Sequence, residues 1–279
     1  MNTPNSSNAA STPNEGPDPA DIPVVILCGG QGTRIREASE KLPKPLIDIG
    51  GRPVLWHIMK TYRAHGFRKF VLCLGYKAWD IKEYFLRYTE NVSDFTINVA
   101  DASGPQFHER ADLDDWEVSL VDTGMHTGTG GRLDRVRHLL DQPYFMVSYG
   151  DGVGAVDLSG ELAALATDPD LMAMVTGVHP TSRYGELATE GNRVVDFAEK
   201  LPSEGWVSGG FFAFRQEFLD RLLSDPSHFF EQGPMQDLAR EQRLGLWEHL
   251  GFWMGMDTYR EYSALNEMWA NGEAEWKIW

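Results

Sequence analysis

Short apolar runs alternate with amphipathic segments along most of the chain. Runs of strand length occur at Ile22–Cys28, Phe70–Leu74, Asp94–Val99, Trp116–Val121 and Tyr144–Ser148. Segments with a helical pattern occur at Pro53–His65, Ala78–Tyr88 and Arg132–Leu140. Strands that are followed repeatedly by helices are typical of a parallel sheet with helices on both faces. The sequence therefore predicts an α/β fold built on a mostly parallel sheet.

The pattern loosens after Asp151. Strands are predicted at Leu171–Val178, Arg193–Phe197 and Gly210–Phe214, separated by turns, which favours a small mixed-sheet excursion. Helices are predicted at Phe218–Leu223, Met235–Leu244 and Tyr259–Ala270. We expect one domain over residues 22–279. Residues 1–21, rich in Asn, Ser, Thr, Pro and Ala, are predicted to be a disordered tail, because they lack side chains that could build a core.

Charge and cysteine content narrow the possible partners. The chain carries 25 Lys and Arg against 41 Asp and Glu, a formal net charge of −16. Such an acidic surface repels nucleic acid and anionic lipid, so an anionic ligand must be held by a local cluster of donors. Cys28 and Cys73 both lie in apolar runs, where buried inert thiols are the simplest interpretation. No apolar run approaches the length of a membrane span, and we expect a cytoplasmic protein.

The most specific local pattern is the glycine-rich stretch Leu27–Arg34, which follows the first predicted strand directly. Gly29, Gly30 and Gly32 let backbone N–H groups approach phosphate oxygens, and a helix beginning near Thr33 would add its positive end. Arg34 can donate two hydrogen bonds to one phosphate. The spacing fits neither the dinucleotide-binding fingerprint nor the P-loop. The alternative is a turn whose glycines serve only tight packing.

The loop, together with the segment Pro43-Lys-Pro-Leu-Ile-Asp-Ile-Gly-Gly-Arg-Pro53, resembles the sugar-phosphate nucleotidyltransferase family. The segments Gly130-Gly-Arg-Leu133, Phe252-Trp253 and Met256-Asp-Thr258 are similar to the glucose-1-phosphate cytidylyltransferase branch. The resemblance runs from Val24 to Trp279 and implies a Rossmann-like, glycosyltransferase-A-like fold. It also implies in-line attack of a sugar 1-phosphate on the α-phosphorus of CTP, with Mg²⁺ bound and pyrophosphate leaving. Such chemistry depends mainly on positioning and charge neutralisation.

The resemblance assigns roles to individual residues. Arg34, Lys44 and Asp151 are the implied catalytic residues, and Asp151 and Asp257 are the implied Mg²⁺ ligands. The implied nucleotide contacts are Leu27, Gly29, Gly30, Gly32, Thr33, Arg34, Lys44, Gly124 and Arg132, with Gly131 giving further access to backbone. The implied sugar-phosphate contacts are Tyr149, Gly185, Glu199, Lys200 and Ser208.

Simpler interpretations exist for several of these residues. Asp151 alone is compatible with an ordinary Asp-Gly turn, and Asp257 with a helix N-cap. Glu199 and Lys200 are compatible with a solvated surface pair. His57 lies among apolar residues and is interpreted as a packed histidine without a catalytic role, and the tryptophans are interpreted as core or interface residues.

Three departures from the family pattern bear on the substrates. Leu201-Pro202 follows Glu199-Lys200, where many relatives have proline directly, and this bears on the sugar. Leu42 stands where the family commonly has a first lysine, which leaves Lys41 as the nearby basic residue. Ser208 stands where the family has an asparagine that contacts sugar hydroxyls. Alternatives with the same chemistry are UTP, dTTP or GTP with another sugar 1-phosphate. A non-catalytic regulator that binds nucleotide sugars is a further alternative. A homo-oligomer is expected from the resemblance, and the aromatic segment Trp269–Trp279 is a candidate interface.

Overall fold

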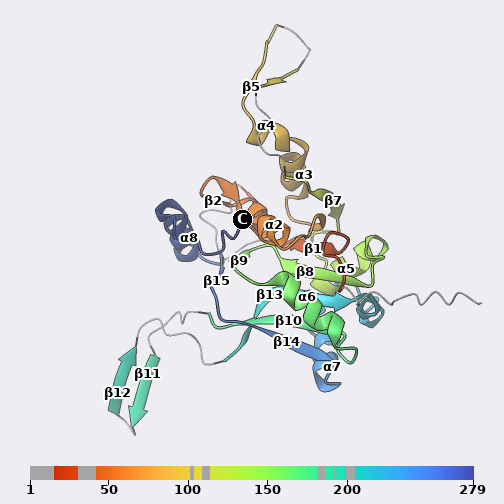
Figure 1. Ribbon diagram of the computed structural model, residues 1–279, viewed down its shortest axis with the longest axis vertical. Helices are drawn as coiled ribbons and strands as arrows, with labels where there is room; N and C mark the ends of the chain where they lie inside the picture. Colours follow the sequence, from red (N-terminus) through yellow and green to blue (C-terminus); the bar gives the residue numbers. More distant parts are fainter. Residues whose placement is uncertain are drawn as a thin grey trace, which may run out of the picture.

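Seven strands form one central sheet in the computed structural model, which describes residues 16–30, 42–100, 104–108, 114–180, 186–190, 193–198 and 205–279 (Figure 1). In spatial order the strands are β14 (Leu244–His249), β10 (Ala173–Val178), β13 (Val207–Arg215), β8 (Tyr144–Tyr149), β1 (Pro23–Cys28), β4 (Lys69–Leu74) and β7 (Glu117–Asp122). Strands β8, β1, β4 and β7 run parallel to one another, and β10 runs parallel to β14. Within this sheet, β13 alone runs antiparallel to both of its neighbours. The predicted mixed, mostly parallel sheet is confirmed.

Strand β1 lies at the centre of the molecule and is covered on both faces. Val24, Val25 and Ile26 are fully buried. Val24 and Ile26 contact one core cluster, whereas Val25 belongs to a second cluster on the opposite face. Successive side chains of a strand point to opposite faces, so a continuous apolar run is what a strand between two cores requires.

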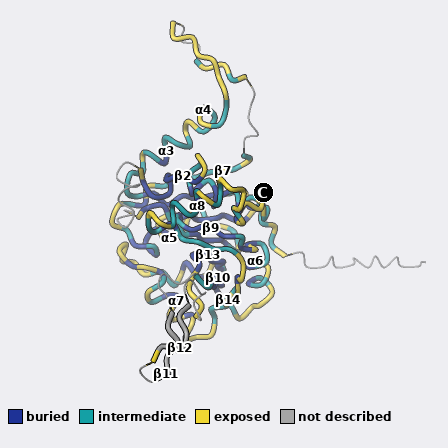
Figure 2. Tube along the Cα trace, turned by 90° about the vertical axis from the view of Figure 1, so that its left-hand side faces the viewer, coloured by how far each residue is buried: buried dark blue, intermediate teal, exposed yellow. Residues whose placement is uncertain are grey.

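Helices cover both faces of the sheet, as predicted. The first core cluster contains side chains of α2 (Val54–Ala64), α3 (Ala78–Leu86), α6 (Leu158–Thr167) and α8 (Tyr259–Asn271). The second contains side chains of α5 (Thr129–Val136), η3 (Gln216–Arg221) and α7 (Pro234–Arg240). Figure 2 shows the buried sheet enclosed by these helices, whose outer surfaces are exposed. The predicted C-terminal helix corresponds to α8.

Two of the strands expected in a separate excursion belong to the central sheet instead. Leu171–Val178 corresponds to β10, and Gly210–Phe214 corresponds to the second half of β13. The physical reason is burial on both faces, since the phenylalanines of β13 contact both core clusters. The third predicted strand, β12 (Arg193–Ala198), pairs only with β11 (Glu186–Glu190) in a small antiparallel sheet.

Several predicted boundaries are wrong. The helix expected over Met235–Leu244 ends at Arg240, because Gln242 has a left-handed φ of 59° and Leu244 then begins β14. Phe218–Leu223 is largely a 3-10 helix, and the helix expected over Arg132–Leu140 is α5 followed by η2 (Arg137–Leu139). Helix α6 was not predicted. It is capped by the Asp157 carboxylate, which accepts a hydrogen bond from the backbone N–H of Gly160.

An arm extends from the body after β4. It consists of α3, α4 (Tyr88–Val92) and a short hairpin of β5 (Phe95–Thr96) and β6 (Gln106–Phe107) (Figures 1 and 2). The expected strand Asp94–Val99 is therefore only two residues long, and the expected helix Ala78–Tyr88 divides at Arg87.

Of the predicted N-terminal tail, residues 1–15 lie outside the described residues. Residues 18–21 form a turn that leads into β1, in which the Asp21 N–H donates to the Asp18 carbonyl oxygen at 3.1 Å. None of the helices in the described part of the chain is long and apolar enough to cross a membrane.

Candidate active site

The carboxyl ends of β1, β4 and β8 meet at one edge of the sheet, and a glycine follows each strand. A Cβ on Gly75 would lie 2.9 Å from the carbonyl oxygen of Gly29, and a Cβ on Gly150 would lie 2.9 Å from that of Leu27. Side chains at these positions would force the strand ends apart. The glycines therefore let three backbones converge at the edge where open parallel sheets bind ligands.

A buried arginine joins these strand ends. The Arg132 guanidinium on α5 donates to the carbonyl oxygens of Leu74 (2.9 Å) and Gly29 (3.3 Å) and to the Thr123 hydroxyl (2.6 Å). Its side chain is almost completely buried, and burial lowers the pKa of the guanidinium from its ordinary value. Arg132 thus fixes the backbone of Gly29, the first glycine of the predicted phosphate loop.

The two described glycines of the phosphate loop have different surroundings. A Cβ on Gly29 would meet the Arg132 guanidinium carbon at 2.1 Å, so this glycine is required for packing. No atom of the described residues lies within 4 Å of a Cβ placed on Gly30. Packing therefore explains Gly29, whereas the packing of the described residues gives no reason for a glycine at position 30.

Lys44 connects two aspartates that are far apart in the sequence. Its Nζ lies 2.7 Å from Oδ2 of Asp151 and 2.8 Å from Oδ1 of Asp257. Lys44 comes from η1 (Lys44–Leu46), Asp151 follows β8, and Asp257 precedes α8. The structure therefore brings together three residues that the family resemblance names for catalysis and metal binding.

The electrostatics of this cluster favour a cation between the carboxylates. Burial lowers the pKa of Lys44, but the Asp151 charge and the hydrogen bonds that the ammonium donates to both aspartates raise it, and together they leave the pKa above its ordinary value. Two carboxylates facing one ammonium retain a net negative charge. Mg²⁺ binds one or two carboxylates together with phosphate oxygens and water, so the donor set fits this ion.

Asp257 is not the N-cap of α8. Thr258 is the cap, and its hydroxyl accepts a hydrogen bond from the Glu261 N–H. The Glu261 carboxylate in turn accepts hydrogen bonds from the backbone N–H groups of Asp257 (2.7 Å) and Thr258 (2.9 Å), which completes a capping box. The Asp257 carboxylate is thereby left to contact Lys44.

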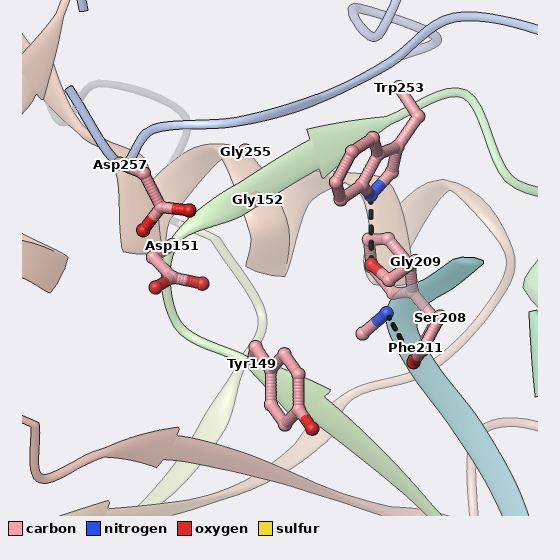
Figure 3. Close-up of a pocket in the computed structure, with 10 residues that line it drawn as sticks. Tyr149, Asp151, Gly152, Ser208, Gly209, Phe211, Trp253, Gly255 and Asp257 are labelled. Atoms are coloured by element: carbon pink, nitrogen blue, oxygen red, sulfur yellow. Dashed lines mark hydrogen bonds between the residues drawn. The ribbon is translucent and has the colours of Figure 1, made fainter. Parts of the chain in front are cut away.

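A pocket of about 300 Å³ opens beside the two aspartates. It exists because β13 is antiparallel to β8, so that the beginning of β13 lies at the same sheet edge as the end of β8. Figure 3 shows Asp151 and Asp257 at one end, Ser208 and Gly209 at the other, and Tyr149 and Trp253 on opposite sides. The volume is at the lower end of the range for small-ligand sites.

The Trp253 indole forms one side of this pocket. Trp253 lies on β15 (Trp253–Gly255), which pairs with β9 (Gly152–Gly154). Its Nε1 donates to the Gly209 carbonyl oxygen at 2.8 Å. The nearest atom to a Cβ on Gly154 would be a Phe252 oxygen or the indole itself, each at 3.2 Å. The glycine at position 154 of β9 therefore leaves room for the ring.

Tyr149 is fixed from the opposite side of the pocket. Its hydroxyl donates to Oε1 of Glu231 at 2.7 Å, and the Thr129 hydroxyl donates to the other carboxylate oxygen. Burial, followed by the Glu231 charge, raises the pKa of Tyr149 far above its ordinary value, so the phenol stays protonated. Glu231 thereby ties the end of β8 to the beginning of α5.

The remaining predicted site residues divide into two groups. Gly124 and Leu27 lie at the same sheet edge, and Gly124 has a left-handed φ of 97°. Gly131 faces Pro226, whose carbonyl oxygen would lie 2.1 Å from a Cβ, so packing explains this glycine. The predicted residues Gly32, Thr33, Arg34, Gly185, Glu199 and Lys200 lie outside the described residues, as does Lys41.

Sequence reasoning gave no role to two residues of this site. Trp253 belongs to the Phe-Trp segment that supported the resemblance, and that segment was its only signal. Glu231 carries no local signal, because its partner Tyr149 lies 82 residues earlier in the chain. His57 is buried and hydrogen-bonded, and Cys28 and Cys73 are buried and unpaired, as expected.

Comparison with known proteins agrees with this geometry. Residues 23–233 match the family model described as nucleotidyl transferase. The chain belongs to this family. It is 38% identical over 256 residues to a probable glucose-1-phosphate cytidylyltransferase of Bacillus subtilis, covering 92% of this chain and 99% of that protein. It is 40% identical over 258 residues to the glucose-1-phosphate cytidylyltransferase of Salmonella typhi, with the same coverage.

Solved structures of nucleotidyltransferases share the fold. HddC from Yersinia pseudotuberculosis, complexed with GMP-PN, superimposes with a TM-score of 0.63 at 20% identity, covering 89% of this chain and 99% of that one. A putative glucose-1-phosphate thymidylyltransferase from Bacillus anthracis gives a TM-score of 0.64 at 14% identity, covering 91% and 95%. The predicted fold class is confirmed.

Proposed function

We propose that this nucleotidyltransferase converts CTP and α-D-glucose 1-phosphate into CDP-glucose and pyrophosphate. The main observation that supports this reaction is the cluster of Lys44, Asp151 and Asp257, which lies at one end of a pocket large enough for a sugar. The choice of CTP and glucose 1-phosphate is supported by the two cytidylyltransferases that match nearly end to end.

The reaction needs no proton transfer at the attacking atom. A phosphate oxygen of the sugar 1-phosphate, already an anion at neutral pH, forms a bond to the α-phosphorus of the triphosphate. The bond from that phosphorus to the oxygen bridging to the β-phosphorus breaks, and pyrophosphate leaves with the electron pair. The protein therefore has to align the two substrates and offset their negative charges.

The residues divide this work. Asp151 and Asp257 would hold Mg²⁺, which supplies positive charge to the phosphates when bound. Lys44 supplies a further positive charge beside them. The sugar would lie between Tyr149 and Trp253, next to Ser208. Arg34 is proposed to neutralise the leaving pyrophosphate, and Lys200 with Glu199 to hold the sugar phosphate.

The decisive experiment measures pyrophosphate release with Mg²⁺, glucose 1-phosphate and each of CTP, UTP, dTTP and GTP in turn. Release with CTP alone is expected, and Asp151→Asn should abolish it. Release with another triphosphate alone would reassign the nucleotide. If no triphosphate gives pyrophosphate release, with glucose 1-phosphate or with other sugar 1-phosphates, the enzymatic proposal is contradicted. Binding of a nucleotide sugar without pyrophosphate release would then indicate a regulator.

We also propose that the protein is a homo-oligomer in which a second copy covers the arm. The arm exposes apolar side chains at Trp79, Leu86, Phe95, Ile97 and Val99. A hairpin with two residues in each strand is not stable alone in water. By contrast, the candidate interface at the C-terminus packs on its own chain, since Trp276 is fully buried in the first core cluster.

A further inference from the structure

The C-terminal aromatic segment encloses a histidine near the beginning of the chain. His57 on α2 is fully buried. Four indole rings surround its imidazole at centroid distances between 4.8 and 6.1 Å, namely Trp56, Trp269, Trp276 and Trp279. Three of these four rings come from the last eleven positions of the chain, so α2 serves as the docking surface of the C-terminal segment.

Two hydrogen bonds determine which ring nitrogen of His57 carries the proton. Its Nδ1 lies 3.3 Å from Nε1 of Trp276, and its Nε2 lies 2.9 Å from the Ile49 carbonyl oxygen. An indole N–H can only donate, so Nδ1 is the acceptor, and Nε2 carries the proton that is donated to Ile49. A neutral imidazole with this tautomer links the C-terminal segment, α2 and β2 (Asp48–Ile49).

A second set of contacts joins α8 to β2 and to Gly50, which follows it. The Asn266 Oδ1 accepts a hydrogen bond from the Gly50 N–H at 2.9 Å, and its Nδ2 donates to the Asp48 carbonyl oxygen at 3.3 Å. Gly50 has a left-handed φ of 59°, and a Cβ there would meet the Trp269 ring at 2.0 Å. We call His57, Asn266, Trp269 and Trp276 the C-terminal clamp.

The clamp joins β2 to α8, and these two elements lie shortly after Lys44 and Asp257 in the chain. Strand β2 begins directly after Ile47, which follows η1, the helix of Lys44. Helix α8 begins directly after Thr258, which follows Asp257. Lys44 and Asp257 are 213 residues apart in the sequence, and the clamp connects the segments that follow them, in addition to their direct ion pair.

Asp151 is positioned independently of the clamp. It follows β8 of the central sheet, and its carbonyl oxygen accepts a hydrogen bond from the Met256 N–H at 2.7 Å. That bond, together with the pairing of β9 and β15, places the chain just before Asp257. The clamp then acts from the other side of Asp257, where α8 begins.

We propose that the C-terminal clamp is a positioning device for the metal site, which sets Asp257 against Lys44 and Asp151 and thereby determines the affinity for a divalent cation. The proposal rests on the proposed function, because that function places the cation at Asp151 and Asp257. Removal of partners that hydrogen-bond metal ligands directly typically changes metal affinity by 10- to 100-fold. The clamp acts through α8 and the segment after η1, so its effect should lie at the lower end of this range.

The test measures Mn²⁺ binding to the full-length protein, with free Mn²⁺ followed by electron paramagnetic resonance. Asn266→Ala removes the hydrogen bonds to the β2 turn, and Trp276→Phe keeps an aromatic ring but removes the bond to His57. We expect Mn²⁺ affinity to fall by about 10-fold for Asn266→Ala and by a smaller factor for Trp276→Phe. Asn266→Asp, which keeps the acceptor for the Gly50 N–H, should recover part of the affinity.

The control is Phe218→Leu, a substitution in the core cluster on the opposite face of the sheet. It should lower Tm without changing Mn²⁺ affinity. If both clamp variants keep the wild-type affinity for Mn²⁺ and have a lower Tm, the clamp only stabilises the fold and the proposal is overturned. An equal loss of affinity in Phe218→Leu would likewise overturn the proposal.

The two proposals fail in different ways. Clamp variants that weaken Mn²⁺ binding, in a protein that releases no pyrophosphate with any triphosphate, would leave the clamp standing and remove the proposed reaction. If the wild-type protein releases pyrophosphate but the clamp variants bind Mn²⁺ as tightly as wild type, the proposed reaction stands and the clamp proposal is removed.

Discussion

At the scale of single residues, Lys44 and Glu161 show how differently two buried charged groups are treated. Lys44 has two carboxylate partners, so its charge is retained. Glu161 is completely buried, its Oε2 accepts a hydrogen bond from the Thr176 hydroxyl at 3.0 Å, and its Oε1 has no hydrogen-bond partner among the residues that the structure describes. The first arrangement stabilises the charged ammonium, whereas the second stabilises a neutral acid.

We expect Lys44→Ala to lower turnover by roughly 10- to 100-fold or more, because the loss of a buried charged donor to phosphate costs about 1.5–3 kcal/mol. Initial rates of pyrophosphate release measure this effect, and circular dichroism confirms the fold. Lys69→Ala is the matched control, since Lys69 forms an exposed ion pair with Asp21. Near wild-type turnover in Lys44→Ala would remove the proposed role.

Glu161 should make stability depend on pH. Burial raises its pKa from 4.5 to about 8, so the folded state binds the proton more tightly than the unfolded state does. The stability contributed by the bound proton is complete below about pH 4.5 and is lost as pH rises towards 8. Glu161→Gln should therefore gain stability relative to wild type by up to about 1.4 kcal/mol per pH unit within this window.

Urea unfolding at several pH values between 5 and 8 measures the difference. Glu217→Gln, on the exposed side of η3, serves as the control and should follow the wild-type pH profile. A constant difference between Glu161→Gln and wild type across the window would show that Glu161 is already ionised in the folded protein.

At the scale of elements, what the sequence predicts depends on how local the cause is. The bounds of strand β1 and helix α2 were predicted to within one residue, because consecutive apolar residues indicate the buried strand and periodic apolar residues indicate the buried face of the helix. The exposed edge strand β14 was missed, because its identity depends on pairing with β10. The roles of Lys44, Asp151 and Asp257 were implied by the resemblance alone, and the contacts of Lys44 with the two aspartates were not predicted, since the spacing of these residues along the chain carries no geometric signal.

The turn after β1 gives a prediction that separates packing from ligand binding. Gly29→Ala should destabilise the protein by about 1–3 kcal/mol, because a methyl group would overlap the Arg132 guanidinium. Gly30→Ala should leave Tm nearly unchanged but weaken the apparent affinity for the nucleotide, because its Cβ would enter the open side of the loop. Thermal unfolding and the KM for CTP distinguish the two. Equal changes of Tm would contradict this division of roles.

At the scale of the whole molecule, a net charge of −16 opposes the binding of two anionic substrates. At the edge of the sheet that carries the pocket, Lys44 is paired with two carboxylates and Arg132 is buried against backbone carbonyl oxygens. The same acidic surface disfavours self-association, so an oligomer needs a strongly apolar contact. The arm supplies the exposed apolar side chains for such a contact.

Substitution of the arm should therefore change the size of the assembly. Leu86 and Val99 are 70% and 95% exposed, and we expect the double variant Leu86→Glu with Val99→Glu to sediment as a smaller species than wild type. Leu250→Glu, at a residue 80% exposed and away from the arm, is the control and should not change the sedimentation coefficient. A monomeric wild-type protein would exclude the proposed role of the arm.

The antiparallel direction of β13 has a consequence for how such a protein can diversify. Strand β10 ends at Val178 and β13 begins at Val207, and both positions lie at the sheet edge that carries the pocket. The connection between them leaves and re-enters the sheet at one place, so insertions or deletions within it need not disturb the register of any strand. Evolution can therefore exchange this connection while the strands of the central sheet remain unaltered.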